Sequence, residues 1–365
     1  MLTTTPAVFA VGKEYQILVK TKRNVFCWIQ VGESRFYDAT SGVVRSLSSL
    51  HRITVPMAVL DAAQGYHVCT RTVTDRKPYF TQAGEAKCTF FPFHPVPEHN
   101  IRAYHIADAH NHIPQPLVAA GVFGQIDFLI LNGDLIDYCT SIRNFNNIYI
   151  LCAKLTGGQI PVVFSRGNHD MRGKIAEKFI DYIPHQHGNT YYTFRLGSIW
   201  GVVLDCGEDK PDDHSAYGGT VACHDFRLQQ TAFLKSIIAN AQNEYAAPGV
   251  KTRLVISHNP FTEKNVPPFD IEEDTYREWS GLLRDYIQPH LMICGHTHLA
   301  QVRQPGHPLD TYGQPCPVVI ASGFDNVSYW TGCGFVFDQD QIQLTFTDSN
   351  GATLSSHQIT THTAP

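Results

Sequence analysis

Five short polar clusters contain the residue types that bind metal ions, and each cluster directly follows an apolar run typical of a buried strand. Asp, Asn and His side chains offer the oxygen and nitrogen atoms that such ions take as ligands. Because open α/β sheets bind ligands beyond the carboxyl ends of their strands, we expect the clusters to converge on one crevice. The clusters are Asp108 and His110 after "YHIA", Asp134 and Asp137 after "FLILN", Arg166, Asn168, His169 and Asp170 after "PVVFS", His258 after "RLVIS", and His296 and His298 after "HLMIC".

A single cluster of this kind is also compatible with an ordinary loop, because Asp and Asn stabilise turns. A lone histidine such as His258 is usually a polar residue with a local partner. The segments "GNHD" at 167–170 and "GHTH" at 295–298 are stronger indications, since ligand-type side chains crowd there beside a glycine. Five clusters in this order, each at the end of a strand, favour one metal site over five unrelated turns.

The clusters together supply carboxylates, one amide oxygen and several imidazoles, and no thiolate. Mixed oxygen and nitrogen ligation suits Mn, Fe or Zn better than a structural cysteine–zinc site. Seven candidate ligands are too many for one tetrahedral ion, but they suit two ions ~3.5–4 Å apart, the clamp used for displacement at phosphorus. The sequence therefore predicts two divalent or transition metal ions held by Asp108, His110, Asp134, Asn168, His258, His296 and His298.

In order, the motifs D-x-H, G-D-x-x-D, G-N-H-D, a single His and G-H-x-H resemble the signature of the calcineurin-like metallophosphoesterases, over roughly residues 101–350. The resemblance implies a four-layer α/β/β/α sandwich and hydrolysis of a phosphomonoester or phosphodiester by a hydroxide that bridges two metals. It places His169 near the leaving group and gives Asp170 the task of orienting it. It assigns Asp108, His110, Asp134 and His298 to the first metal, with Asp134 as the bridge, and Asn168, His258 and His296 to the second.

A β-rich segment before such a domain is similar to the purple acid phosphatases. Those enzymes carry a metal-binding tyrosine three positions after the aspartate of the second motif. Asp137 occupies that position here, and Tyr138 stands one step later. The resemblance therefore does not imply a tyrosine-bound ferric ion.

Substrate selection is expected from the loops between the motifs. The polar segments 204–226 and 259–274 are long enough for either to form a lid over the metals. His214 and Tyr217 are candidate substrate-binding residues, although both could be ordinary loop residues. Arg166 could bind a phosphate oxygen, but an ion pair that fixes its own loop is the favoured interpretation.

The chain from residue 101 onward has the pattern of an α/β domain, in which short apolar runs alternate with longer helical stretches. We expect helices within 141–155, 173–183, 225–241 and 272–287. After residue 317 the runs "PVVIAS", "GFVFD" and "IQLTF" follow one another without helices. They predict a closing meander of strands and hence a second sheet.

Residues 1–97 differ from the rest, because β-branched and aromatic runs recur there at short spacing without a helical period. They predict an all-β domain of the immunoglobulin or fibronectin type, joined by a proline-rich linker at 93–99 to a catalytic domain at 98–365. The sequence does not indicate what the N-terminal domain does.

Composition limits the class of protein. The 365 residues are 43% hydrophobic and 17% charged, which fits a globular core rather than disorder. The net charge of −5 disfavours a nucleic-acid partner on electrostatic grounds. No apolar run approaches a membrane span, and the first residues lack the pattern of a signal peptide. The ten cysteines form no C-x-x-C pair, so we expect reduced thiols and a cytoplasmic location.

These observations predict a metal-dependent phosphoesterase that acts on a small-molecule or macromolecular phosphoester. One alternative is a scaffold that keeps the fold and has lost catalysis, but such proteins usually lack metal ligands, and all of them are present here. Another is a metal-dependent nuclease, which the negative charge and the absence of a basic stretch disfavour.

Overall fold

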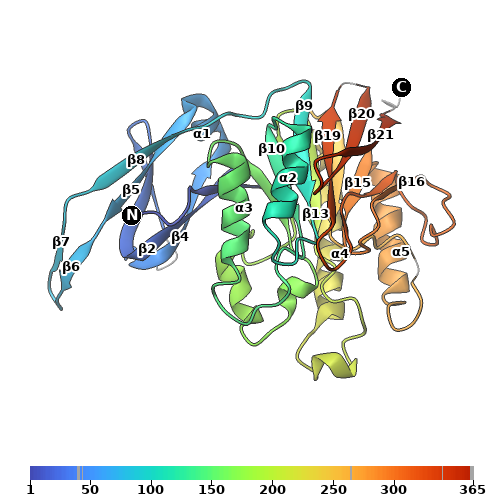
Figure 1. Cartoon of the computed structure of the whole chain (residues 1–365), viewed down its shortest axis with the longest axis horizontal. Coiled ribbons are helices and arrows are strands. Elements are labelled where there is room, and N and C mark those ends of the chain that lie inside the picture. The colour runs from blue at the N-terminus through green and yellow to red at the C-terminus, as the bar shows by residue number, and fades with distance from the viewer. Residues whose placement is uncertain (39–41, 43, 264, 339, 362–365) are drawn as a thin grey trace.

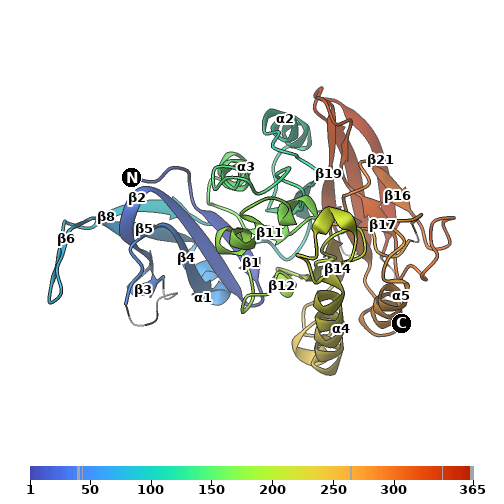
Figure 2. The ribbon, with the colours of Figure 1, turned by 90° about the horizontal axis from the view of Figure 1, so that it is seen from below.

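The computed structural model describes residues 1–38, 42, 44–263, 265–338 and 340–361. These residues form two large β-sheets that lie face to face, with helices outside both (Figures 1 and 2). The order of the layers through the C-terminal part is helix, sheet, sheet, helix. The chain starts in the strands at the left of Figure 1, and its last strands lie at the right.

The first sheet is parallel at its centre and antiparallel at its C-terminal edge. Strand β9 pairs in parallel with β10, and β10 pairs in parallel with β11, so the carboxyl ends of these three strands lie together. On the far side of β9 the chain adds antiparallel strands. The strands that the C-terminal part contributes to this sheet are β9 (Ile101–Ile106), β10 (Phe128–Asn132), β11 (Val162–Ser165), β18 (Gly323–Phe324), β19 (Trp330–Phe337), β20 (Gln341–Asp348) and β21 (Thr353–Thr360).

The second sheet has six strands, and four of them are parallel neighbours. An antiparallel strand closes each edge. In spatial order the strands are β12 (Tyr192–Leu196), β13 (Ile199–Leu204), β14 (Thr252–Ser257), β15 (Leu291–Cys294), β17 (Val318–Ile320) and β16 (Gln301–Arg303).

Two helices lie outside each sheet, as the view from below makes plain (Figure 2). None of the described helices is long and apolar enough to cross a membrane. The first sheet carries α2 (Pro114–Phe123) and α3 (Asn146–Thr156), and the second carries α4 (Cys223–Ala239) and α5 (Glu273–Leu282), which continues into the π-helical turn η5 (Leu283–Ile287). Short 3-10 segments are η1 (His169–Met171), η2 (Ala176–Tyr182), η3 (Ser215–Tyr217) and η4 (Ala241–Asn243).

Three apolar clusters fill the spaces between the four layers. Successive side chains of a strand point to opposite faces, so Ile130 of β10 packs between the sheets and Leu131 packs against the helices. In the second sheet Leu254 points inward and Val255 points toward α4 and α5. Because both faces of these strands are buried, their sequences are uninterrupted apolar runs.

The predicted α/β architecture with two sheets is confirmed, and so are helices within 141–155, 225–241 and 272–287. The helix predicted at 173–183 is wrong, since this segment forms the 3-10 turns of η2. Only Phe179 of η2 is buried, so the segment has no apolar face that would stabilise a full α-helix. Helix α2 was not predicted.

The three runs after residue 317 do not form one meander. "PVVIAS" forms β17 in the second sheet, whereas "GFVFD" and "IQLTF" belong to β19 and β20 in the first. Strand β19 pairs with β9, more than 200 residues earlier in the chain. A local sequence pattern cannot reveal such a change of sheet.

The N-terminal segment is rich in strands, as predicted, but the sequence missed one helix, α1 (Met57–Ala63). Pro56 precedes this helix, and four of its seven residues are Ala or Leu with Met at its start, which is a recognisable helix signal. The remaining elements are β1 (Ala7–Val11), β2 (Glu14–Val31), β3 (Ser34–Tyr37), β4 (Ser48–Pro56), β5 (Gly65–Arg71), β6 (Val73–Arg76), β7 (Thr81–Ala83) and β8 (Lys87–Pro92).

The N-terminal strands are joined to the rest of the molecule. Strand β1 pairs in parallel with β11, and the apolar cluster between the sheets continues into side chains of β1 and β2. An immunoglobulin or fibronectin type is not shown for these strands. The domain boundary at residue 97 stays a prediction.

Cys69 of β5 and Cys88 of β8 form a disulfide between neighbouring antiparallel strands. The prediction that all ten cysteines are reduced is therefore wrong for this pair. The sequence pattern could not reveal the pairing, because the two residues lie 19 positions apart and meet only through strand register. The other eight cysteines are free and buried.

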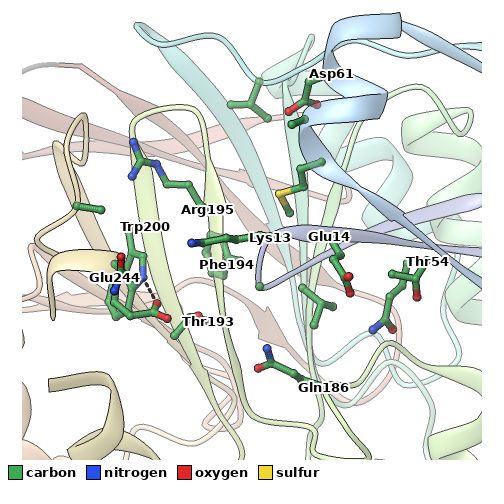
Figure 3. Close-up of a pocket in the computed structure, with 18 of the residues that line it drawn as sticks. Lys13, Glu14, Thr54, Asp61, Gln186, Thr193, Phe194, Arg195, Trp200 and Glu244 are labelled. Atoms are coloured by element: carbon green, nitrogen blue, oxygen red, sulfur yellow. Dashed lines mark hydrogen bonds between the residues drawn. The ribbon is translucent and has the colours of Figure 1, made fainter. Parts of the chain in front are cut away.

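A groove of about 1610 Å³ lies between the N-terminal strands and the edge of the second sheet (Figure 3). Its lining includes Glu98, which precedes β9, and Trp200, near the start of β13. Trp200 Nε1 donates a hydrogen bond of 2.9 Å to Glu244 across one wall (Figure 3). The residues that line the groove include none of the polar clusters, so the groove is separate from them.

Candidate metal centre

The carboxyl ends of β9, β10, β11, β14 and β15 bring the predicted clusters together, as the sequence implies. Six of the seven predicted ligands form two groups, and within each group one ligand atom per residue lies within 4.8 Å of the others. The seventh, Asn168, touches the second group through its side-chain amide. The first group is Asp108, His110 and His298, and the second is Asp134, His258 and His296.

The backbone at these ligands adopts a conformation that ordinary residues avoid. Five of the seven have a positive φ, between 43° and 71°. Such left-handed backbone costs on the order of 1–3 kcal/mol per residue and persists where the surroundings enforce it, often at functional sites. The five residues are Asp108, His110, Asp134, His296 and His298.

Glycines allow the loops to approach one another closely. A Cβ atom at Gly167 would overlap Asp134 Oδ1, and one at Gly133 would lie 2.6 Å from both Gly167 N and His258 Nδ1. The loop after β10 is thus packed directly on the loop after β11. The missing side chain of Gly167 makes room for Asp134.

Ring nitrogens in the first group converge. His110 Nε2 and His298 Nε2 lie 3.2 Å apart, and His298 Nε2 is 3.4 Å from Asp108 Oδ1. The other ring nitrogen of His110, Nδ1, lies 2.8 Å from Asp137 Oδ1. This contact orients the ring of His110 and leaves Nε2 to face the site.

The second group is more deeply buried. His258 Nε2 lies 3.1 Å from Asp134 Oδ2 and 3.7 Å from Asp108 Oδ1, while its Nδ1 donates to the Asn132 carbonyl at 2.7 Å. His296 Nδ1 is 3.1 Å from the Asn168 amide. The resemblance assigns the bridge to Asp134; these contacts also place Asp108 Oδ1 beside histidines of both groups.

The donor set fits metal ions. His258 Nε2 is fully buried and has no aligned hydrogen-bond partner among the described residues, although it points at two carboxylates. His110 and His298 direct two Nε2 atoms at one another, an arrangement that a shared cation would explain better than a hydrogen bond. Carboxylate, amide and imidazole donors without sulfur suit Mn, Fe or Zn.

Charge balance in the site shifts several pKa values. Burial opposes protonation of His258, but the carboxylates of Asp134 and Asp108 outweigh it and raise its pKa to about 10. Burial raises the pKa of Asp134, whereas the charge of His258 lowers it, and the pKa lies below its ordinary value. Burial and then the charge of His258 lower the pKa of His296 to about 4.

Asp170 does not contact the ring of His169, contrary to the prediction. Its Oδ2 accepts hydrogen bonds from the backbone N–H groups of Gly167 at 2.9 Å and Asp134 at 3.1 Å, so it holds the two loops together. Burial, and then the charge of Asp134, raise the pKa of Asp170 to about 8. The ring of His169 is held by other groups: Nδ1 by the Asp137 carbonyl at 3.0 Å and Nε2 by Arg172 at 3.0 Å.

The three candidate substrate-binding residues are placed differently. Arg166 Nε donates to the buried carboxylate of Asp205 at 2.8 Å, which agrees with the favoured interpretation of a loop-fixing ion pair. His214 accepts a hydrogen bond from the Ala216 N–H and begins η3. The Tyr217 hydroxyl donates to Glu208, at 3.0 Å.

Several residues at the site were not found from the sequence. Ser322 Oγ donates to Asp108 Oδ2 at 2.7 Å, and Asn132 holds His258 through its carbonyl. Arg172 contacts His169 and is paired with the buried Glu208. Arg172 lies only two positions after the third cluster in the sequence, so it could have been proposed as a site residue. Glu208 and Ser322 are distant in the sequence and reach the site only through the fold.

The fold and the site define a class: two-sheet α/β proteins with a metal centre at the carboxyl ends of their strands. The sequence profile of the calcineurin-like phosphoesterases matches residues 101–300. This stretch is more than half of the chain and includes all five clusters. The chain therefore belongs to the calcineurin-like phosphoesterase family.

One solved structure supports this fold over nearly the whole chain. A purple acid phosphatase from yellow lupin (Lupinus luteus) seeds is similar over 98% of this chain and 74% of its own, with a TM-score of 0.59 and 12% identity. Vacuolar protein sorting 29 from Cryptosporidium parvum matches 72% of this chain and 100% of its own, with a TM-score of 0.36 and 10% identity. A search of curated proteins finds no match. The lupin enzyme supports the fold of the whole chain, N-terminal strands included.

Proposed function

We propose that this protein hydrolyses a phosphoester by a mechanism that depends on two divalent or transition metal ions. The observation that carries the proposal is the presence of two adjacent groups of buried and partly buried candidate ligands, each with a carboxylate and two imidazoles. Two ions bound there would supply the charge that neutralises a phosphate and lowers the pKa of a bound water. Mn, Fe and Zn all suit these donors.

The chain's own residues prepare the site in three ways. Asp108 and Asp134 are fully buried and accept hydrogen bonds from Ser322 and from the His169 N–H, so their oxygens are fixed in direction. Asn168 contributes a neutral oxygen, which adds no negative charge that would repel phosphate. Asp137 fixes the ring of His110 with Nε2 toward the site.

The substrate is proposed only as a class. Phosphomonoesters and phosphodiesters both remain candidates, on a small molecule or a macromolecule. A silent scaffold is disfavoured because the structure assembles both ligand groups in full. A nuclease is disfavoured by the net charge of −5. The cytoplasmic location stays a prediction, and the Cys69–Cys88 disulfide removes one of its supports.

The test is metal analysis of the purified full-length chain together with a panel of chromogenic phosphomonoesters and phosphodiesters. We expect close to two transition metal ions per chain and hydrolysis of at least one substrate class that stops on chelation and returns with metal. A metal-loaded protein that hydrolyses nothing on a broad panel would favour the scaffold.

Substitutions at two neighbouring residues of the third cluster test which of them binds metal. Asn168→Ala is expected to weaken binding of one metal, because it removes an oxygen beside His296. His169→Ala is expected to keep both metals and to slow turnover, since its ring nitrogens contact Asp137 and Arg172 rather than the ligand groups. Metal content by elemental analysis decides; loss of metal in His169→Ala would overturn these roles.

A further inference from the structure

Arg172 lies against the metal centre on the side of the third cluster. Its Nη1 is 3.0 Å from His169 Nε2, and its Nη2 lies 2.9 Å from the side-chain amide of Asn168. A guanidinium group has only donors, so His169 Nε2 accepts this hydrogen bond and Nδ1 carries the ring proton toward the Asp137 carbonyl. While this contact persists, Nε2 has no proton to donate.

The side-chain amide of Asn168 has two possible orientations. They differ in whether its oxygen or its nitrogen faces Arg172 Nη2. With its oxygen toward Arg172, the amide accepts from Nη2 at 2.9 Å. With its oxygen toward His296 and Asp134, where it would serve as a ligand, the amide nitrogen faces Nη2 instead. Two donors then meet, and Nη2 donates to the carboxylates of Glu208 and Asp209 alone.

Buried carboxylates hold the guanidinium in this place. Glu208 Oε1 accepts from Arg172 Nε at 3.0 Å and Oε2 accepts from Nη2 at 2.8 Å, which is a two-point pair. The Glu208 side chain is only 2% exposed, whereas that of Arg172 is 31% exposed. Asp209 adds a contact of 3.3 Å, and the Tyr217 hydroxyl donates to both carboxylates. Arg172 is therefore anchored from behind with its outer edge open.

Helix α4 in turn fixes the loop that carries Glu208. Arg227 of α4 donates to the carbonyls of Cys206 and Glu208, and Gln230 binds both the N–H and the carbonyl of Asp205. Arg227 and Gln230 are almost fully buried. A surface ion pair that only pinned a loop would not need this support, because such pairs contribute little.

Arg172 keeps one N–H donor for a ligand. Of its five N–H groups, Glu208, Asp209 and His169 engage Nε, Nη2 and one hydrogen of Nη1. The other Nη1 hydrogen has no partner among the described residues. This N–H can donate one charge-assisted hydrogen bond to a phosphate oxygen while the planar fork stays paired with Glu208, a geometry that the point charge of lysine cannot reproduce.

We propose that Arg172 is a catalytic residue that binds the phosphoryl group of the substrate, and that Glu208 and His169 are its positioning residues. This inference rests on the proposed phosphoester hydrolysis and deepens it. The ligand class is a phosphate monoanion or dianion, as an ester or as inorganic phosphate.

The experiment measures binding of inorganic phosphate to the metal-loaded full-length protein by calorimetry, alongside kcat and KM. Arg172→Ala is expected to weaken phosphate binding about 10- to 100-fold, the range for a lost charge-assisted pair, with metal content unchanged. Added guanidinium is expected to restore part of both binding and turnover in Arg172→Ala. Arg172→Lys is expected to recover less than full binding, because it keeps the charge and loses the fork.

Glu208→Gln keeps the shape of the positioning group and removes its charge, so it is expected to lower kcat and phosphate affinity less than Arg172→Ala does. Arg277→Ala is the matched control, since Arg277 forms an exposed pair with Glu273 on one turn of α5 and is expected to behave as wild type. If Arg172→Ala does not fold, Arg172→Lys and Glu208→Gln carry the test.

Two results would overturn the inference: unchanged phosphate affinity in Arg172→Ala and Arg172→Lys, or loss of metal in both. Failure of the proposed function looks different. A wild-type protein that binds phosphate through Arg172 but hydrolyses no phosphoester contradicts the function and leaves the binding role intact. A wild-type enzyme that is active and indifferent to Arg172 substitutions contradicts only the role of Arg172.

Discussion

At the scale of single residues, the candidate centre is a balance of buried opposite charges. Asp108 and Asp134 are both buried, and the histidine that faces them, His258, is held protonated by their fields. A bound metal ion would neutralise these carboxylates in place of the proton on His258. A proton on His258 and a metal ion can therefore each compensate the negative charge of the same carboxylates, and the two compete.

The competition predicts how metal affinity depends on pH. In the metal-free protein the pKa of His258 is raised to about 10, so at pH 6–9 a bound metal must displace one proton from it. The apparent affinity is then expected to rise about tenfold per pH unit across this window and to level off above pH 10. Titration against a chelator of known affinity measures the slope, and His258→Gln should flatten it. An affinity independent of pH in the wild-type protein would show that His258 is not a ligand.

At the scale of elements, the loops after β10 and β11 act as one unit because Gly167 lets them touch. A Cβ at position 167 would overlap Asp134 Oδ1 and lie 2.5 Å from its backbone nitrogen. Asp170 then ties the same loops through two hydrogen bonds. The position of one metal ligand thus depends on a residue that binds no metal.

Gly167→Ala is therefore expected to push Asp134 out of place, lowering the free energy of unfolding by about 1–3 kcal/mol and weakening metal binding. Gly121→Ala is the control, since Gly121 lies in α2 with no atom within 4 Å of its added Cβ. That control is expected to be neutral or to stabilise by about 0.5–1 kcal/mol. Chemical denaturation and metal analysis compare the two variants. Equal stability and full metal content in Gly167→Ala would contradict the packing argument.

The sequence predicted the strands and helices whose positions follow from a local pattern of residues. The strands before Asp108, Asp134 and His258 were predictable because a buried strand is a continuous apolar run and its ligand follows directly. Contacts such as Ser322 with Asp108, or Glu208 with Arg172, join residues 214 and 36 positions apart and follow only from the fold. The same reason explains why the change of sheet after β17 and the disulfide between β5 and β8 were not foreseen.

At the scale of the whole molecule, the candidate centre joins the two sheets. Loops after strands of the first sheet provide Asp108, His110, Asp134 and Asn168, whereas loops after strands of the second provide His258, His296 and His298. Hydrogen bonds also cross this boundary, because Asn132 of β10 donates to the carbonyls of Ser257 and Ile293. Ions bound at the centre would therefore stabilise the contact between the halves as well as the loops.

Removal of metal is accordingly expected to lower the stability of the whole chain. A ligand that binds only the folded state at 100 times its Kd stabilises it by about 2.7 kcal/mol, so chelation should lower Tm and excess metal should restore it. His258→Ala removes a ligand from the second sheet and is expected to shrink this metal-dependent shift. Arg277→Ala, in an exposed pair of α5, should leave it unchanged. Calorimetric scans with and without chelator provide the comparison. If a protein shown to contain metal unfolds identically in both, the ions do not link the sheets, and the two halves of the centre are held together by the apolar cluster between them alone.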